Sequence, residues 1–348
     1  MEFITPPPLA PGDSVAVIAP SSGGAASAPQ VLSLGLRRLK DEFDLHPVVD
    51  PTARQSDEFL RANPRARAAA IHSAFRDPDI QGVIATIGGD DQLRVLRHLD
   101  PAVLREHPTR FYGMSDNTNL ALFLWNEGIV SFYGGQLLNQ VATPGHLHNY
   151  TKRYLRRAFF DEQFGTLEPS DEWADLTVGW HRDDYAEVDP QYQDATGWIW
   201  AGSDGTVTGR VWGGCLAILE WQLMTGRYLP EPDRLDGAVL VLETAEDMPS
   251  ANRVKWTLMS MGERGLLERF DAMLVGRPAT ENWQEERSLT ERQEYRSAQR
   301  DAIRKQVARY NPDAPLVFDL DFGHTNPTAP IPIGSRVRIE PMERIEFL

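Results

Sequence analysis

Residues 111–125 read FYGMSDNTNLALFLW, a stretch that predicts a strand, a sharp turn at Ser115 and an apolar-faced helix. A tight turn from Gly113 to Ser115 would lift the serine hydroxyl clear of a sheet, as a nucleophile requires. The backbone N–H of Asp116 would point toward the helix N-terminus, where negative charge is stabilised. Because Asn117 stands two residues after the serine, the stretch departs from the G-x-S-x-G pattern of α/β-hydrolases. The sequence therefore predicts the sharp turn but does not support membership of the α/β-hydrolase family.

Strands and helices alternate on both sides of this stretch. Through roughly the first 140 residues, apolar runs such as SVAVIA (14–19) and GVIATIGG (82–89) are each followed by a segment with helical spacing. Alternation resumes after residue 205, with the strand-like GAVLVLETAE (237–246) and a charged helix near 285–309. This pattern predicts an α/β fold in which parallel sheets are flanked by helices.

The alternation breaks down in an aromatic, acidic and turn-rich stretch at 146–205. That stretch contains four tryptophans, Trp173, Trp180, Trp198 and Trp200. We therefore predict an N-terminal α/β domain at 1–145, a connecting region at 146–205 and a C-terminal α/β domain at 206–348. Packing at a domain interface is the alternative role for each tryptophan.

Composition limits the classes of partner. The chain has 348 residues, 41% of them hydrophobic and 24% charged, which is typical of a globular protein with sizeable cores. A formal net charge of -15 argues against nucleic acid or an anionic membrane as the main partner and favours small substrates. The first residues lack a basic, apolar leader pattern, so we expect a cytoplasmic protein. The single Cys215 excludes an internal disulfide and a cysteine-based zinc cluster, and we expect no cofactor.

A nucleophilic serine needs a histidine as its base. His324 is the favoured candidate because it follows the apolar strand PLVFDLDFG, and strand ends carry function in such sheets. The alternative for His324 is a loop histidine that caps local backbone. His146 and His148 form an H-x-H pattern, but no carboxylate pattern supports a metal site there. His46 precedes a proline in a predicted linker.

Two further groups are candidates for the orienting acid and the oxyanion donors of the same active site. Glu243 ends the apolar strand AVLVLE, where a carboxylate is costly to bury unless something pairs with it. The alternative is a solvent-exposed strand end. Gly88 and Gly89 stand between a strand and a helix, where their backbone N–H groups can point outward as oxyanion donors. A phosphate-binding loop would look similar, but no further glycine or Gly-Lys pattern follows.

Five segments, taken together and in order, resemble the serine peptidase family of L,D-carboxypeptidases and microcin C immunity peptidases. They are IGGDDQL (87–93), YGMSDNT (112–118), GRVWGG (209–214), VLVLETAE (239–246) and DFGHTNPTAPIPIG (321–334). The resemblance spans nearly the whole chain. It implies an N-terminal domain of flavodoxin-like character, a C-terminal α/β domain, an active site at their interface and a homodimer.

The resemblance also implies a metal-independent hydrolase with a Ser-Glu-His triad. In that mechanism Ser115 attacks an acyl carbonyl, His324 transfers the proton and Glu243 orients the imidazole. The backbone amides of Gly89 and Asp116 would hold the oxyanion. No cofactor takes part.

Details of the chain resemble the immunity-peptidase branch more than the murein-recycling branch. The polar residue Asp90 and its acidic neighbour follow the glycines, and the connecting region is rich in tryptophan. This branch implies a peptidyl- or aminoacyl-nucleotide-like substrate, with Trp180 favoured for stacking on a nucleobase. Gly88 and Asp247 are further candidate substrate contacts, and a helix N-cap is the alternative for Asp247. Cys215 stands where the family often has asparagine.

Three other functions stay open from the sequence. Murein tetrapeptide cleavage by an L,D-carboxypeptidase would use the same triad on a peptide stem. An acyltransferase would use it with an acceptor other than water. A small-molecule binding protein without chemistry could also be built from two α/β domains.

Overall fold

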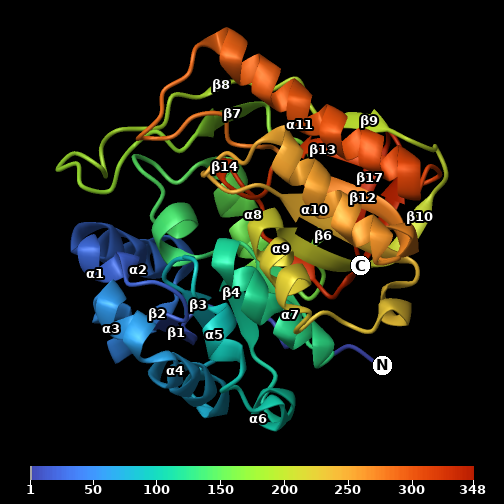
Figure 1. The fold of residues 1–348 in the computed structure, drawn as a ribbon. Coiled ribbons are helices and arrows are strands. Elements are labelled where there is room, and N and C mark those ends of the chain that lie inside the picture. The colour runs from blue at the N-terminus through green and yellow to red at the C-terminus, as the bar shows by residue number, and fades with distance from the viewer. Residues whose placement is uncertain (1) are drawn as a thin grey trace. The chain divides into compact units, whose positions relative to one another are not determined.

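The computed structural model describes residues 2–348, which form two compact units. Unit 1 comprises the N-terminal segment up to Phe164, together with Trp180–Asp189 and Thr328–Gly334. Unit 2 comprises Gly165–Gly179, Pro190–Pro327 and Ser335–Leu348. Each unit is an α/β structure, which confirms the predicted fold class (Figure 1). The boundaries at residues 145 and 205 remain predictions about domains.

Unit 1 is built on a six-stranded sheet in the order β15-β5-β4-β3-β1-β2. Five strands are parallel, and β15 is antiparallel to its neighbour β5. Strands β3, β4 and β5 are buried along their whole length, as expected for a parallel sheet covered on both faces. The bounds are β1 Ser14–Ile18, β2 His46–Val49, β3 Gly82–Ala85, β4 Arg110–Gly113, β5 Ser131–Tyr133 and β15 Ile331–Ile333.

Helices lie around this sheet, among them α2, α4 and α7 (Figure 1). Three of them begin with proline, at Pro29, Pro64 and Pro101, where the missing N–H costs no helical hydrogen bond. The bounds are α1 Gly24–Ser27, α2 Pro29–Phe43, α3 Asp57–Ala62, α4 Pro64–Arg76, α5 Leu93–Leu96, α6 Pro101–Glu106, α7 Thr118–Asn126 and α8 Asn149–Phe160.

Two expectations from the sequence about unit 1 were wrong. His46 begins the edge strand β2 and does not lie in a linker; Pro47 is tolerated there because an edge strand need not use its N–H. The stretch predicted as turn-rich contains the helix α8, half of whose buried residues are aromatic. Tyr150, Tyr154 and Phe159 are three of its six buried residues, and aromatic residues have a lower helix propensity than Ala or Leu.

Unit 2 contains an eight-stranded sheet in the order β6-β17-β16-β10-β11-β12-β13-β9. Its centre, β10 to β13, is parallel and largely buried, and antiparallel strands complete both edges. The bounds are β6 Gly165–Leu167, β9 Ile199–Ala201, β10 Val207–Cys215, β11 Ala238–Glu243, β12 Phe270–Gly276, β13 Leu316–Leu320, β16 Arg336–Glu340 and β17 Arg344–Phe347. A small second sheet joins β14 (Thr325–Asn326), β7 (Glu172–Asp175) and β8 (Gln193–Asp194).

Three helices accompany the sheets of unit 2, α9 (Leu216–Thr225), α10 (Ala251–Glu263) and α11 (Leu289–Tyr310). Helices α10 and α11 pack closely, since a Cβ at Gly262 would lie 2.4 Å from the ring of Tyr310. Serine caps start both: Ser250 accepts from Arg253 N–H, and Ser288 forms a capping box with Glu291.

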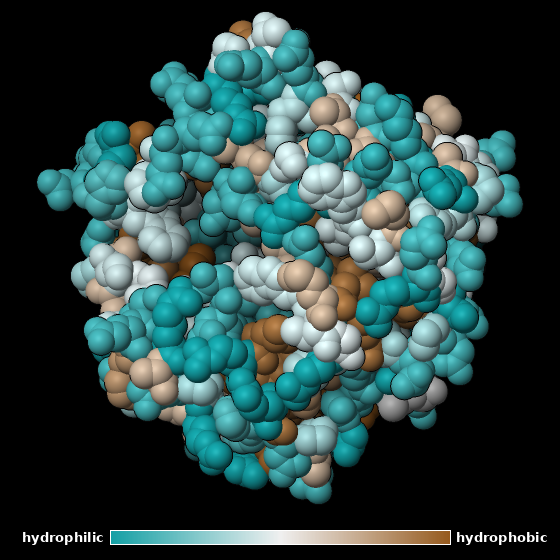
Figure 2. All heavy atoms as spheres, in the orientation of Figure 1, coloured by the Kyte–Doolittle hydropathy of each residue, from teal (hydrophilic) through white to brown (hydrophobic). Residues whose placement is uncertain are grey.

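The surface visible in Figure 2 is mostly hydrophilic, in keeping with the acidic composition. Within residues 2–348, none of the helices has the length and apolar character that crossing a membrane requires.

Candidate active site

Ser115 lies in a strained turn directly after β4. Its φ of 61° is in the left-handed region, which costs a non-glycine residue roughly 1–3 kcal/mol and is frequent at functional sites. Every other residue from 111 to 122 is buried, whereas Ser115 is half-buried. A short 3-10 turn, Ser115–Asn117, then leads into α7. The predicted strand, sharp turn and helix are confirmed.

The turn is held by specific contacts. The Ser115 N–H donates to the Tyr133 hydroxyl at 3.0 Å, and the Thr118 hydroxyl donates to the Ser115 carbonyl at 2.7 Å. Gly113 is required because a Cβ there would lie 2.8 Å from the Cβ of Asn117. The strained conformation of Ser115 is therefore imposed by its neighbours.

The diglycine loop after β3 passes close to Ser115. A Cβ at Gly88 would lie 2.7 Å from the Ser115 Cβ and 3.0 Å from its Oγ. A Cβ at Gly89 would lie 2.7 Å from Ser21 Oγ and 2.8 Å from Ser22 Cβ. The Ser22 hydroxyl also donates to the Gly88 carbonyl at 2.6 Å. Within unit 1, the structure thus brings the predicted glycines and serine together, and only glycine fits at both positions.

The side chain of Asp116 organises these loops, a role that the sequence analysis missed. Its buried carboxylate accepts hydrogen bonds from the Ser21 hydroxyl, from the backbone N–H of Asp91 at 2.9 Å and of Gln92 at 2.8 Å, and from the Asn119 amide at 2.9 Å. Burial raises the pKa of Asp116, and the four donors oppose that rise.

These partners follow the carboxyl ends of three adjacent strands. Ser21 follows β1, Asp91 follows β3 and Asp116 follows β4. Sequence reasoning assigned only the backbone N–H of Asp116. The available signal was the polar run 116–119 between Ser115 and the apolar Leu120, which is entirely buried in the structure.

The acidic pair after the glycines is divided between two environments. Asp90 is exposed and pairs with Arg61 at 2.6 Å, whereas Asp91 is buried against Arg67 at 2.7 Å. The predicted substrate contact of Asp90 stays a prediction. Asp91 has a structural role.

Trp180 lies beside the same loops of unit 1. A Cβ at Gly24 would lie 3.1 Å from Cζ3 of Trp180 and 3.2 Å from Cγ2 of Ile87, the residue before Gly88. Gln30 donates to the Trp180 carbonyl at 2.5 Å, and the residue is half-buried.

The other three tryptophans pack within unit 2. Trp173 is buried with the Arg296 guanidinium 4.8 Å from its ring centroid. Trp198 Nε1 donates to Asp321 at 3.0 Å, and Trp200 lies in β9 opposite Val317. These contacts lie within unit 2, so the alternative of packing at a domain interface stays a prediction for these residues.

Glu243 and His324 form a buried pair in unit 2. The imidazole Nδ1–H donates to Glu243 Oε2 at 2.7 Å, and both side chains are almost completely buried. A Cβ at Gly323 would lie 2.6 Å from that Oε2, and a Cβ at Gly276 would lie 2.9 Å from the Glu243 Cβ. The alternatives of an exposed strand end and a backbone-capping loop histidine are therefore wrong.

A second carboxylate contacts the same imidazole. His324 Nε2 lies 3.1 Å from Oε2 of Glu246, whose side chain is 52% exposed. Burial alone would lower the pKa of His324, but Glu243 and Glu246 raise it to about 9. The sequence analysis missed Glu246, although it ends the quoted segment VLVLETAE.

The contacts of Cys215 and Asp247, which lie near Glu243 in unit 2, limit the roles that these two residues can have. Cys215 is buried opposite Glu243 in the β10–β11 register; burial, and then the charge of Glu243, raise the pKa of its thiol, so it is no candidate nucleophile. Asp247 pairs with Arg253 at 3.0 Å. Because Ser250 caps α10, the helix-cap alternative for Asp247 is wrong.

The histidines of the H-x-H pattern make local contacts in unit 1. His146 pairs with Asp189 at 3.2 Å, and His148 accepts from Tyr150 N–H at the start of α8. Across residues 2–348, His, Cys, Asp and Glu side chains form no group of three or more suited to a metal ion.

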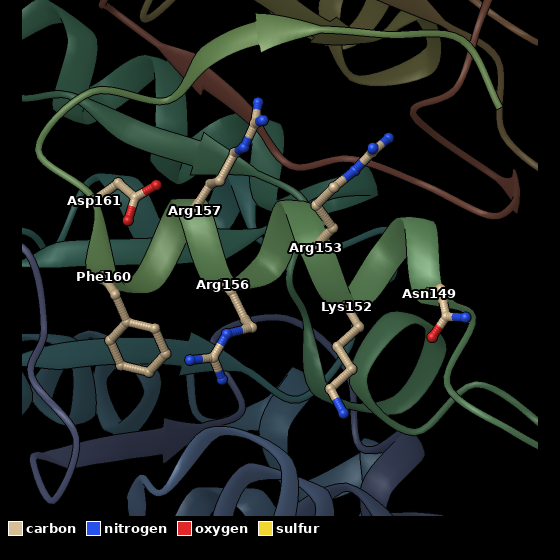
Figure 3. A pocket seen from close by; sticks show the side chains of 7 residues that line it. All are labelled: Asn149, Lys152, Arg153, Arg156, Arg157, Phe160 and Asp161. Carbon is tan, nitrogen blue, oxygen red and sulfur yellow. The ribbon is translucent and has the colours of Figure 1, made fainter.

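A surface depression on α8 is lined mainly by basic side chains and differs in chemistry from the groups around Ser115 and His324. Figure 3 shows Arg153 and Arg157 pointing to one side of the helix and Lys152 and Arg156 to the other. Lys152 pairs with Glu42, and the arginines lie over aromatic rings of α8. The depression presents no serine, cysteine or histidine, and we assign it no chemistry.

Comparison with known proteins identifies the family. Residues 15–134 match the LD-carboxypeptidase N-terminal domain, and residues 208–339 match the LD-carboxypeptidase C-terminal domain. The chain belongs to the LD-carboxypeptidase family. These matches confirm the predicted family, which is a family of carboxypeptidases.

The chain is similar to proteins that are named for each of the two predicted branches. Microcin C7 self-immunity protein MccF of Escherichia coli is 23% identical over 339 residues, which cover 96% of this chain and 92% of that protein. A crystal structure of an MccF-like protein from Streptococcus pneumoniae in complex with AMP has a TM-score of 0.85 and 25% identity, covering 97% of this chain and 98% of that one. "Probable murein peptide carboxypeptidase" of Bacillus subtilis is 29% identical over 175 residues, 50% of this chain and 53% of that protein.

Replacing Asp116 with alanine should strongly destabilise unit 1. The change leaves four buried donors without an acceptor, so we expect the free energy of unfolding to fall by about 3 kcal/mol or more. Urea unfolding measures the change. Asp90→Ala is the matched control, because an exposed ion pair contributes roughly 0–1 kcal/mol. Equal effects of the two substitutions would contradict the role given to Asp116.

Stability should also depend on pH through His324. Its pKa rises from 6.5 to about 9 on folding, so its contribution is complete below pH 6.5 and is lost as the pH rises through 9. The corresponding loss is about 3 kcal/mol. Urea midpoints between pH 6.5 and 9.5 test this, and His324→Gln should remove that part of the slope. An unchanged slope in His324→Gln would refute the assignment.

Proposed function

We propose that this chain is a metal-independent serine peptidase or amidase that cleaves an amide bond in aminoacyl- or peptidyl-nucleotide-like compounds. The observation that carries the proposal is the buried contact between Glu243 and His324. A carboxylate and an imidazole fixed at 2.7 Å are the orienting acid and the base that a serine nucleophile requires. The family and the strained Ser115 support the same chemistry.

The proposed reaction has two stages. Ser115 Oγ attacks the acyl carbonyl while His324 Nε2 accepts its proton, and the imidazolium then protonates the leaving amine. The backbone N–H groups of Gly89 and Asp116 hold the oxyanion. Water, deprotonated by the same imidazole, releases the acyl group. Glu243 orients the imidazole throughout, and the reaction needs no metal.

The proposal assigns one reaction to groups on both units. Ser115 belongs to unit 1, whereas Glu243 and His324 belong to unit 2. The family resemblance implies that these three residues act together in one reaction. It also implies a homodimer. Size-exclusion chromatography with light scattering measures the oligomeric state.

Nucleotide-like substrates are favoured by two observations. Solved relatives include MccF in complex with aspartyl sulfamoyl adenosine and with glutamyl sulfamoyl guanosine. In this chain Trp180 lies half-buried beside Gly24 and Ile87, close to the diglycine loop. We propose that its ring stacks on the nucleobase, with Gly88, Asp90 and Asp247 as further substrate contacts.

Murein tetrapeptide cleavage is the second candidate function. The observation that favours it is the match to the Bacillus subtilis protein named for murein peptides. The same triad would then release a terminal D-amino acid. In that case the ring of Trp180 would serve packing against Gly24.

Alanine at Ser115 or His324 should abolish activity without unfolding the protein. Triad members act as a unit, so we expect kcat to fall by at least about three orders of magnitude in either variant. Amide cleavage is followed by mass spectrometry, and folding by circular dichroism. Ser33→Ala and His146→Ala are matched controls on exposed residues. Near-normal rates in the Ser115 variant, or inhibition by a chelator, would refute the proposed mechanism.

A side-by-side assay decides between the two substrate classes. We expect cleavage of an aminoacyl sulfamoyl adenosine and little or no release of D-alanine from a murein L,D-tetrapeptide, with Ser115→Ala as the blank. Trp180→Ala should then raise KM for the nucleoside compound more than it lowers kcat. Cleavage of the tetrapeptide alone would replace the first candidate function with the second.

A further inference from the structure

His324 is held between two carboxylates of very different mobility. Glu243 contacts Nδ1 and is fully buried against Gly276 and Gly323, where a Cβ would collide with it. Glu246 contacts Nε2 at 3.1 Å, and its side chain is 52% exposed. One partner is therefore fixed and the other is free to rotate into solvent.

The backbone of Glu246 is anchored although its side chain is exposed. Asn282 Nδ2 donates to the Glu246 carbonyl at 2.9 Å, and Met248 N–H donates to the Ala245 carbonyl at 3.1 Å. Rotation of the side chain alone would break the contact with His324. No change in the loop is needed.

The two contacts determine the state of the imidazole. Carboxylates only accept hydrogen bonds, so an imidazole between two of them carries a proton on both nitrogens. An Nε2 that holds a proton cannot accept one from a serine. The contact with Glu246 therefore keeps the base in its inactive, protonated form.

We propose that Glu246 is a specificity-determining residue that favours aminoacyl over peptidyl compounds, because it leaves His324 most readily when it pairs with a protonated amine on the acyl part of the substrate. This inference rests on the proposed function. The ammonium group takes the place of the imidazolium beside the carboxylate and keeps its own proton. The Nε2–H bond then breaks, its proton passes to bulk water, and His324 becomes the neutral base.

The surrounding charges suit a cationic group. The groups that face the imidazole electrostatically are Glu243 on β11 and Glu246 and Asp247 after it; the thiol of Cys215 on β10 is neutral. Arg253 on α10 pairs with Asp247 and with Glu220. An amine is therefore attracted, whereas an N-acylated substrate offers no cation to displace Glu246.

The test uses Ser115→Ala protein, which binds without turnover, with and without the added change Glu246→Gln. The titration of His324 is followed by NMR of the imidazole nitrogens, alone and with alanyl sulfamoyl adenosine or its N-acetyl derivative. The free-amine compound should lower the titration midpoint by a pH unit or more, and the N-acetyl compound should not. In Glu246→Gln protein the midpoint should already be lower by a similar amount, and neither compound should move it.

Turnover supplies the second readout. Enzyme with Ser115 intact should prefer the free-amine compound over the N-acetyl compound at least tenfold in kcat/KM at pH 7, and Glu246→Gln should reduce this preference to within twofold. Glu285→Gln, at a side chain 54% exposed, is the matched control and should keep the preference. An unchanged midpoint in Glu246→Gln, or no shift with the free-amine compound, would overturn the inference. Absence of any cleavage would instead refute the proposed function, because the titration needs no turnover.

Discussion

The buried carboxylate of Asp116 is the interaction on which the geometry of unit 1 depends. It accepts hydrogen bonds from loops that follow β1 and β3, while its own backbone forms the turn that begins at Ser115. A buried carboxylate is tolerated only when donors surround it, so these loops cannot separate without leaving a charge unsatisfied. The close approach of Gly88 to Ser115 and the left-handed conformation of the serine occur beside this carboxylate, between the loops that it joins.

Unit 2 solves a similar problem in a different way. Glu243 ends a strand that is buried along its whole length, and the imidazole of His324 supplies the donor that its carboxylate needs. The glycines at 276 and 323 leave room for the Glu243 side chain, which a Cβ at either position would meet within 3 Å. Glu246 reaches the same ring from solvent, so the histidine combines a fixed partner with a replaceable one.

Much of this was predictable from the sequence because it is local. The apolar runs of β1, β3 and β11, and the turn after β4, follow from residue patterns within a few positions. The side-chain role of Asp116 and the contact of Glu246 with His324 were not predicted, because their partners are distant in sequence, up to 95 residues for Ser21. Strand β2 was missed because it is short and contains proline, and α8 because half of its buried residues are aromatic.

The central claim is that Ser115 is a nucleophile activated by His324. Intact-protein mass spectrometry after treatment with a fluorophosphonate tests it most directly, since such reagents label an activated serine irrespective of the substrate. The account predicts one phosphonyl adduct, located on Ser115 by peptide mapping and lost in His324→Ala. A folded wild-type protein that takes no adduct, or takes it at another serine, would contradict the account.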